Sequence, residues 1–170
     1  GGFLTHRMRV ALVAAATRFH RDTERTRRTH RFADLLADAG HDVVVCCARW
    51  WTGGRRRVTH RGITYRGVSG DPADRGVAAR LATVVPRLRP DVVHAVGDVP
   101  AHVLGAAVGA RLSRAPLVVD WYDYADDAGA GGLAGRLARA AARAGTAVVT
   151  PSRTVETHVR ELGASYERTR

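Results

Sequence analysis

The sequence predicts an α/β domain, doubly wound, with a six-stranded parallel sheet and helices on both faces. Three observations lead there. Short apolar runs, typical of strands buried on both faces, alternate with segments whose apolar residues recur at helical spacing. The connections between them are short, which favours parallel strands and right-handed crossovers. The chain has 170 residues, of which 45% are apolar, and this suits one domain with a proper core. The default strand order for such a Rossmann-like domain is 3-2-1-4-5-6.

Each expected strand is a continuous apolar run with turn residues on either side. The third run is weaker because it contains polar residues. The six runs, in chain order, are Val10–Ala15, Val43–Ala48, Ile63–Val68, Val92–Val96, Leu117–Asp120 and Ala147–Thr150. Between the second and the third, Gly53, Gly54 and three arginines are expected to form a loop.

Each expected helix shows an apolar stripe and a start or stop signal. The first begins at a cap, Asp22 or Thr23, and ends at Gly40, which can adopt the left-handed conformation. The helix of small residues carries Gly105 and Gly109, which would allow close approach to a sheet. The remaining helices are Val77–Leu88, stopped by Pro90; Ala101–Leu112, the one with both glycines; Leu133–Ala144; and a last helix through Val155, Val159 and Leu162 that ends at Gly163. Residues 1–7 precede the only methionine and are expected to be a cloning remnant or an upstream extension that lies outside the fold.

The formal net charge is +11, and every basic residue other than histidine is an arginine. The absence of lysine excludes a P-loop, a Schiff-base lysine and an SxxK nucleophile. Residues 1–70 hold 14 arginines and 5 acids, so the excess lies in the N-terminal half. Such a basic surface is expected to bind nucleic acid, anionic lipid or a phosphorylated ligand. The alternative is a solvated surface without function.

Two adjacent cysteines, Cys46 and Cys47, lie within an expected strand. Neighbouring strand residues point to opposite faces, so the pair predicts two buried thiols in a reducing compartment. No run approaches the length of a membrane-spanning helix. We therefore expect a cytoplasmic protein, with a peripheral position at the inner face of the membrane as an open alternative.

In this fold, ligands bind beyond the carboxyl ends of the strands where the chain reverses direction. The loops there are Ala16–Thr23, Gly97–Pro100 and Trp121–Asp127. Arg18, His20 and Arg21 stand at a helix N-terminus, where an anion is favoured, although a solvated and capped loop would look the same. His94 lies within its strand and is expected to be a core histidine, whereas Gly97 and Asp98 lie at the strand end.

The segment DWYDYADD follows the fifth strand and combines acids with aromatic rings. Rings can cover the C–H faces of a sugar while carboxylates accept from its hydroxyls, so Trp121, Tyr122 and Asp123 are candidate site residues. The alternative is a capped loop packed on the next helix. Trp50 and Trp51 could border the same opening, with core or rim packing as the expected role. GxGxxG after the first strand, GxSxG and metal-ligand spacings are all missing, which disfavours a nicotinamide oxidoreductase, a nucleophile elbow and a metal site.

Five segments recur in one family in this order and spacing: MRVALVAA, RFADLLADAGHDVVVCCA, RLRPDVVHAVG, APLVVDWYD and AGTAVVTPSRTVETHVRELGA. From Met8 to Gly163 the chain resembles the N-terminal half of a GT-B glycosyltransferase of the family 4 kind. The resemblance implies an acceptor-side domain, residues 8–163, with 164–170 beginning a linker to a C-terminal domain that binds a nucleotide-sugar donor. It also implies transfer with retention, without a metal, to a glycan or lipid-linked acceptor.

By this resemblance, Asp123 and Asp98 are the expected catalytic residues, which orient acceptor hydroxyls. Arg18 and Arg21 meet a phosphate, and Ser152 caps the last helix at the cleft edge. The chain departs from the family pattern at Ala14–Thr17, where many members carry a glycine pair, and at Val96, where some members place a histidine. A non-enzymatic nucleic-acid-binding module is the alternative, although the chain shows no nucleic-acid motif and its arginines are scattered.

Overall fold

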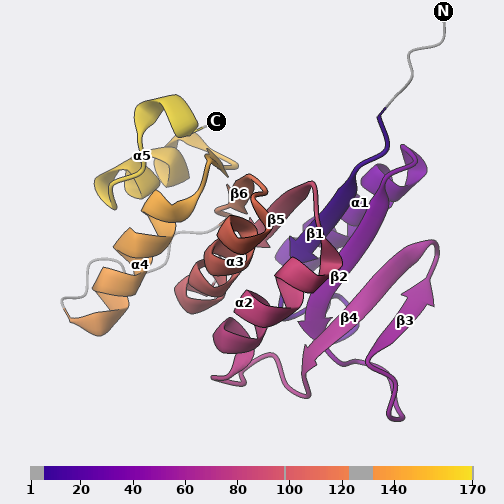
Figure 1. The fold of residues 1–170 in the computed structure, drawn as a ribbon. Coiled ribbons are helices and arrows are strands. Elements are labelled where there is room, and N and C mark those ends of the chain that lie inside the picture. The colour runs from indigo at the N-terminus through magenta and orange to yellow at the C-terminus, as the bar shows by residue number, and fades with distance from the viewer. Residues whose placement is uncertain (1–5, 98, 123–131, 170) are drawn as a thin grey trace, which may run out of the picture.

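The computed structural model describes residues 6–97, 99–122 and 132–169, which form one seven-stranded sheet with helices on both faces (Figure 1). The strands are β1 (Arg9–Val13), β2 (Asp42–Ala48), β3 (Arg57–His60), β4 (Ile63–Ser69), β5 (Val92–Val96), β6 (Leu117–Asp120) and β7 (Ala147–Val149). They are arranged in the order β3-β4-β2-β1-β5-β6-β7. Without β3 this is the predicted parallel order, so the doubly wound fold is confirmed.

β3 is the strand that the sequence analysis missed. It pairs antiparallel with β4, and the two strands join through Arg61 and Gly62, whose φ angles are 49° and 76°. Two central residues with positive φ are the mark of a tight hairpin turn whose twist matches the strands. The expected loop was therefore wrong in its last part, because β3 has one apolar residue, Val58, and so shows no alternating pattern.

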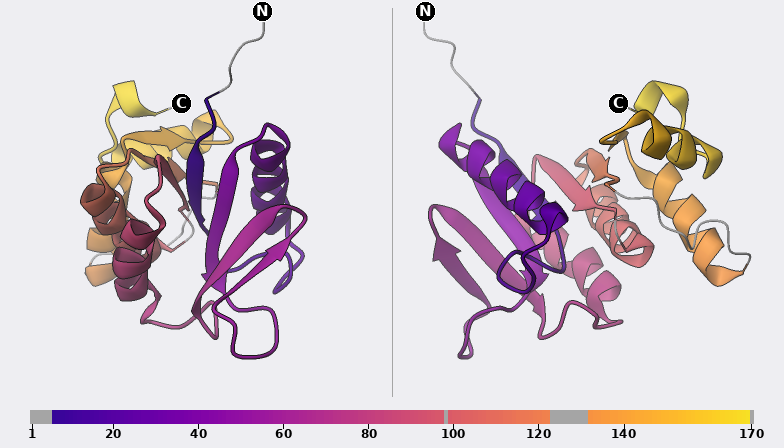
Figure 2. Two further views of the ribbon diagram at one scale, coloured as in Figure 1. Left: turned by 45° about the vertical axis from the view of Figure 1, so that its right-hand side comes forward. Right: turned by 180° about the vertical axis from the view of Figure 1, so that it is seen from behind.

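The helices divide unequally between the two faces. They are α1 (Glu24–Asp38), α2 (Val77–Leu88), α3 (Pro100–Ser113), α4 (Leu133–Ala144) and α5 (Arg153–Glu161), followed by the short 3₁₀ helix η2 (Tyr166–Arg168). Buried residues of α2, α3, α4 and α5 all pack into one core, whereas α1 packs on the opposite face (Figure 2). Thr23 caps α1 through a reciprocal pair of hydrogen bonds with Thr26, as one of the two expected caps.

The sheet separates two hydrophobic cores, and the cysteines show this directly. Cys46 belongs to the larger core under α2 and α3, and Cys47 to the smaller core under α1. Both are free thiols with no exposed surface. Burial raises the pKa of Cys46 to about 12, and burial also raises the pKa of Cys47. The prediction of two buried thiols on opposite faces is confirmed.

The glycines of α3 make contact with a helix and not with the sheet, which corrects the expectation. A Cβ added at Gly105 would lie 2.3 Å from the carbonyl oxygen of Ala78, and one at Gly109 would lie 2.7 Å from the Cβ of Val85. Both neighbours belong to α2. The missing side chains therefore let the backbones of α2 and α3 approach more closely than any larger residue would permit.

The chain after α5 returns to the domain. Ala164 and Thr169 are buried, and Thr169 forms an isolated parallel bridge with Val148 of β7. Residues 164–169, where the linker was expected to begin, thus pack beside the β7 edge of the sheet. Among the described helices, none has the length and hydrophobicity that crossing a bilayer requires.

Candidate functional site

The candidate site lies at the carboxyl edge of the sheet, where β1, β5 and β6 end. The strands that follow β1 extend the sheet toward one edge, whereas β5, β6 and β7 extend it toward the other edge. The strand order therefore reverses between β1 and β5, which are neighbours in the sheet. Crevices of this kind gather ligands in doubly wound folds. The described residues there come from the loop before α1, the end of β5 and the end of β6. Asp98 and residues 123–127, Asp123 among them, lie outside the described residues.

Asp120, the last residue of β6, is the carboxylate at the centre of this edge. Its side chain is 12% exposed and receives two hydrogen bonds from Arg28 of α1, at 3.1 Å from Nη2 and 3.4 Å from Nε. The Nε2 atom of His94 lies 3.7 Å from Oδ2 of Asp120, the oxygen that also accepts from Nε of Arg28. The His94 ring also packs on Phe32, with centroids 4.6 Å apart. His94 is therefore a buried histidine with partners, as expected.

The environment of Asp120 keeps it ionised. Burial acts to raise its pKa, but contact with His94 and the charge of Arg28 act in the opposite direction and prevail, so the pKa lies below its ordinary value. A carboxylate with a lowered pKa is a poor general base because its affinity for a proton is low. It can instead hold a fixed negative charge and orient Arg28.

Tyr122 continues this arrangement two residues beyond the strand. The guanidinium groups of Arg25 and Arg28 lie 5.9 Å and 5.5 Å from the centre of its ring. Cation–π contacts at these distances are attractive. The N-terminal half of α1 is therefore held at the end of β6 through Asp120 and just beyond it through Tyr122.

The loop before α1 forms a compact turn around Thr17. Its backbone N–H donates to Nδ1 of His20 at 3.0 Å, and its carbonyl accepts from the N–H groups of His20 and Arg21. Burial lowers the pKa of His20, and backbone contacts with Arg49 and Thr17 only partly offset this. A neutral ring that accepts at Nδ1 braces the loop, whereas Arg18 and Arg21 have exposed side chains.

Aromatic rings hold the outer side of the same loop. Phe19 stacks on Trp50 with centroids 4.1 Å apart, and both rings meet Tyr65 edge to face. Trp51 meets Trp50 edge to face and donates from Nε1 to the carbonyl of Arg55 at 2.9 Å. Rim packing, the expected role of the two tryptophans, is what the structure gives them.

Three other expected site residues have structural contacts. Trp121 is 1% exposed and lies in the larger core, so its ring offers no face to a sugar. A Cβ at Gly97 would lie 3.1 Å from that ring, which explains why a glycine suits the end of β5. Ser152 caps α5, with its Oγ 3.4 Å from the N–H of Val155. Of the expected set, Tyr122 contacts the arginines of α1, whereas Arg18 and Arg21 have exposed side chains in the loop before α1.

A hollow of about 550 Å³ opens beside Asp120 on the face that carries α1. Its apolar lining includes Phe32 and Leu35 of α1 and the valines Val92, Val118 and Val149 of the sheet. Arg28, His94 and Asp120 belong to the same lining. The site therefore combines a fixed charge pair with an apolar wall. Within the ranges that the structure describes, no cluster of His, Cys, Asp or Glu could hold a metal ion.

Arg28 and Asp120 are the residues that sequence reasoning missed. Asp120 was assigned to a strand end, and Arg28 is one of many arginines in the first helix. A signal was present, because an acid at the last position of an apolar strand must find a buried partner. The arginine that pairs with Asp120 is determined by the orientation in which α1 packs on the sheet. No sequence pattern predicts that orientation.

The sequence and the fold both resemble known proteins. Residues 25–170 match the family described as Glycosyl transferase 4-like domain. Sucrose-phosphate synthase from Thermosynechococcus elongatus superposes on 96% of this chain with a TM-score of 0.72 at 12% identity, and 47% of that chain is covered. HepE of Anabaena, solved with UDP and glucose, gives a TM-score of 0.69 at 16% identity, with 96% of this chain and 43% of that chain covered.

A UDP-N-acetylglucosamine 2-epimerase from Rickettsia bellii shares the fold as well, with a TM-score of 0.63 at 12% identity over 96% of this chain and 44% of that chain. The chain thus spans less than half the length of these structures. No curated protein sequence matches it. The fold is that of the GT-B glycosyltransferases, and the match extends over most of the sequence. The chain belongs to the glycosyl transferase 4-like domain family.

Proposed function

We propose that this domain is the acceptor-binding half of a glycosyltransferase that moves a sugar from a nucleotide-sugar donor to an acceptor, with retention of configuration. The family match over residues 25–170 carries the proposal. Likeness to HepE, whose structures hold UDP-glucose or UDP and glucose, supports a nucleotide sugar as the donor. A glycan or a lipid-linked sugar is the proposed acceptor class.

The residues at the carboxyl edge divide the work as follows. Asp123 and Asp98 orient the acceptor hydroxyl, and the exposed Arg18 and Arg21 contact a phosphate of donor or acceptor. Tyr122 supports the segment that carries Asp123, because Arg25 and Arg28 hold its ring. The reaction needs no metal in this proposal, since arginine side chains can stabilise the charge on a leaving diphosphate.

A second domain supplies most of the donor site in this proposal. Isolated, the 170-residue chain would fold and transfer no sugar, because an acceptor without a bound donor does not react. Coverage of less than half of the similar structures is the observation behind this division.

The test uses the 170-residue chain and a longer product of the same gene that includes the sequence downstream of Arg170. Transfer of labelled sugar is measured with a panel of nucleotide sugars, UDP-glucose first, and with glycan and lipid-linked acceptors. The longer chain should transfer sugar and the 170-residue chain should not. Transfer by the 170-residue chain at a rate proportional to enzyme concentration would contradict the proposed division.

Two variants of the longer chain test the residue roles. Asp123→Asn should lower kcat by about 100-fold, since it keeps the shape of the side chain and removes its charge. Asp38→Asn, an exposed position at the other end of α1, is the matched control and should keep normal kcat. If Asp123→Asn retains kcat but melts at a lower temperature, Asp123 is only a loop cap.

A further inference from the structure

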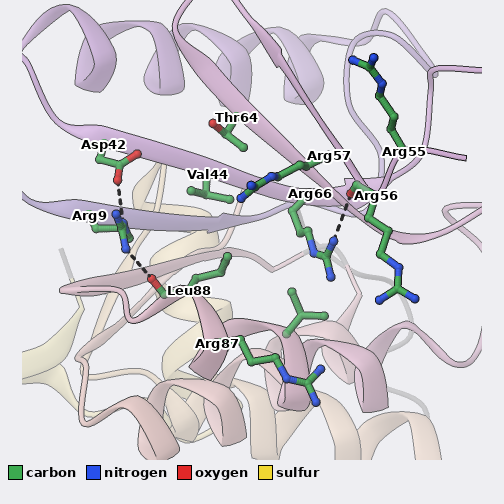
Figure 3. Close-up of a pocket in the computed structure, with 11 residues that line it drawn as sticks. Arg9, Asp42, Val44, Arg55, Arg56, Arg57, Thr64, Arg66, Arg87 and Leu88 are labelled. Carbon is green, nitrogen blue, oxygen red and sulfur yellow. Dashed lines mark hydrogen bonds and ion pairs between the residues drawn. The ribbon is translucent and has the colours of Figure 1, made fainter.

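A second concave surface lies on the opposite face of the sheet from the Asp120 site. A hollow of about 770 Å³ opens between α2 and the strands β2, β4 and β3 (Figure 3). Six arginines and one carboxylate line it, and we call it the arginine hollow. The arginines are Arg9, Arg55, Arg56, Arg57, Arg66 and Arg87, and the carboxylate is that of Asp42. It reaches the amino ends of β1 and β2, where Arg9 and Asp42 lie.

Most of the positive charge in this hollow has no carboxylate partner. Asp42 is bound by Arg9 at 2.6 Å. Among the residues that the structure describes, no ion pair involves the other five arginines. Figure 3 shows Arg66 of β4 and Arg56, the residue before β3, extending toward α2, from which Arg87 extends. Three guanidinium groups from two different layers thus line one space without counter-charge.

The sheet itself is unfavourably charged at this place. Arg57 of β3 and Arg66 of β4 lie directly opposite each other in the antiparallel pair. Like charges in directly opposed positions destabilise a sheet. Residues that destabilise the fold locally are typical of binding sites, where the ligand needs them. An anion between these strands and α2 would remove the repulsion.

The backbone around the hollow is fixed by hydrogen bonds. The carbonyl of Arg56 accepts from the N–H of Gly67 at 2.9 Å and from Nη1 of Arg66 at 3.4 Å. These bonds hold Arg56 beside Arg66 at the open end of the β3–β4 hairpin. A neighbouring hollow shares Arg56, Arg66 and Arg87, and there Arg80 is neutralised by Asp74 at 2.6 Å. In that neighbouring hollow, the arginines without an ion pair among the described residues are therefore Arg49 and the three shared ones.

We propose that the arginine hollow binds a compact, multiply phosphorylated small molecule, held by Arg56, Arg66 and Arg87. Guanidinium groups match phosphate oxygens with two parallel hydrogen bonds, which favours phosphate over a single-point anion. The arginines come from two facing walls, so the ligand must enter between them. A flat membrane would reach only the rim. This site lies on the other face from the proposed acceptor site and is independent of it.

The experiment uses the 170-residue chain and inorganic tripolyphosphate as the probe, measured by isothermal titration calorimetry at 20 mM and 200 mM NaCl. Saturable binding is expected, and it should weaken at the higher salt because ions screen the arginines. The triple variant Arg56→Gln, Arg66→Gln, Arg87→Gln should bind at least about tenfold more weakly. Should that variant fail to fold by circular dichroism, Arg87→Gln alone should weaken binding about threefold, because this exposed helix position loses one phosphate contact.

The matched control removes three arginines elsewhere. Arg136, Arg139 and Arg153 are exposed on α4 and α5, and the triple change to glutamine lowers the net charge equally. It should leave tripolyphosphate affinity unchanged within twofold. Equal loss in both triple variants, or no binding at 20 mM NaCl, would overturn the proposal. The proposal would also be overturned if the protein bound phosphatidylglycerol vesicles but not tripolyphosphate, and if the first triple variant no longer bound the vesicles.

Discussion

Replacing Arg28 with methionine should destabilise the domain by removing the charged partner of Asp120. Methionine keeps much of the side-chain length and loses the guanidinium group. Asp120 would then remain as a buried carboxylate, with His94 3.7 Å away as its nearest basic group. Removal of one partner from a fully buried ion pair costs about 3–5 kcal/mol, whereas exposed pairs are worth about 0–1 kcal/mol.

The size of the effect depends on how exposed the pair is. The Arg28 side chain is 35% exposed and that of Asp120 is 12% exposed, so solvent screens the guanidinium in part. We therefore expect an intermediate loss of about 2 kcal/mol in the free energy of unfolding at pH 7. With a slope of about 2 kcal/mol per molar urea, the unfolding midpoint should fall by about 1 M.

The loss should also depend on pH, in a direction set by Asp120. Its pKa in the folded protein is lowered, so its contribution to stability is present above the unfolded value of about 3.9 and disappears as pH falls through the folded value. The difference between wild type and Arg28→Met should thus be full at pH 7 and shrink below about pH 4.

Urea titrations followed by tryptophan fluorescence measure both quantities. Arg31→Met is the control, because Arg31 lines the same hollow and is exposed; its change should stay within about 0.5 kcal/mol. The double variant Arg28→Met, Asp120→Asn should be less destabilised than the sum of its single variants. If Arg28→Met is no less stable than Arg31→Met, Asp120 does not depend on Arg28 and our account of the site is wrong.

Three further predictions concern packing, capping and thiol chemistry. Gly105→Ala should destabilise by about 2 kcal/mol despite the better helix propensity of alanine, because its Cβ meets the Ala78 backbone; Gly54→Ala, with open space around it, should be neutral in the same urea titration. Ser152→Ala should lower the free energy of unfolding by about 1 kcal/mol through loss of the α5 cap, and an unchanged melting curve would contradict this. The two cysteines should resist an aromatic disulfide reagent at pH 8 in the native protein and both react in urea, whereas rapid native labelling would contradict their burial.

The fold was predictable because its signals are local. Six apolar runs alternate with helical segments over short connections, which predicts a parallel sheet, and 3-2-1-4-5-6 is the default order of such a fold. β3 was not predictable in the same way, since Arg57–His60 gains its stability from pairing with β4 and has little apolar pattern of its own. The role of Gly105 was half predicted: close approach was expected, but the partner is α2.

The site was less predictable because it depends on contacts between distant residues. The carboxyl edge and its loops follow from topology alone. The pairing of Arg28 with Asp120 joins residues 92 positions apart, and no sequence pattern distinguishes Arg28 from its neighbours. Trp121 shows the opposite error: an aromatic residue after a strand suits sugar binding, yet the core accommodates the whole ring.

The two edges of the sheet have a consequence for how the protein behaves at high concentration. An open edge strand offers unpaired backbone groups to another copy, and polymerisation begins there. β3 is four residues long and presents Arg57, while β7 is three residues long and is bridged by Thr169. Short length, charge repulsion and a covering segment therefore protect both edges from intermolecular pairing. Arg57→Val would remove the charge from the β3 edge, so self-association should be measured first in such a variant.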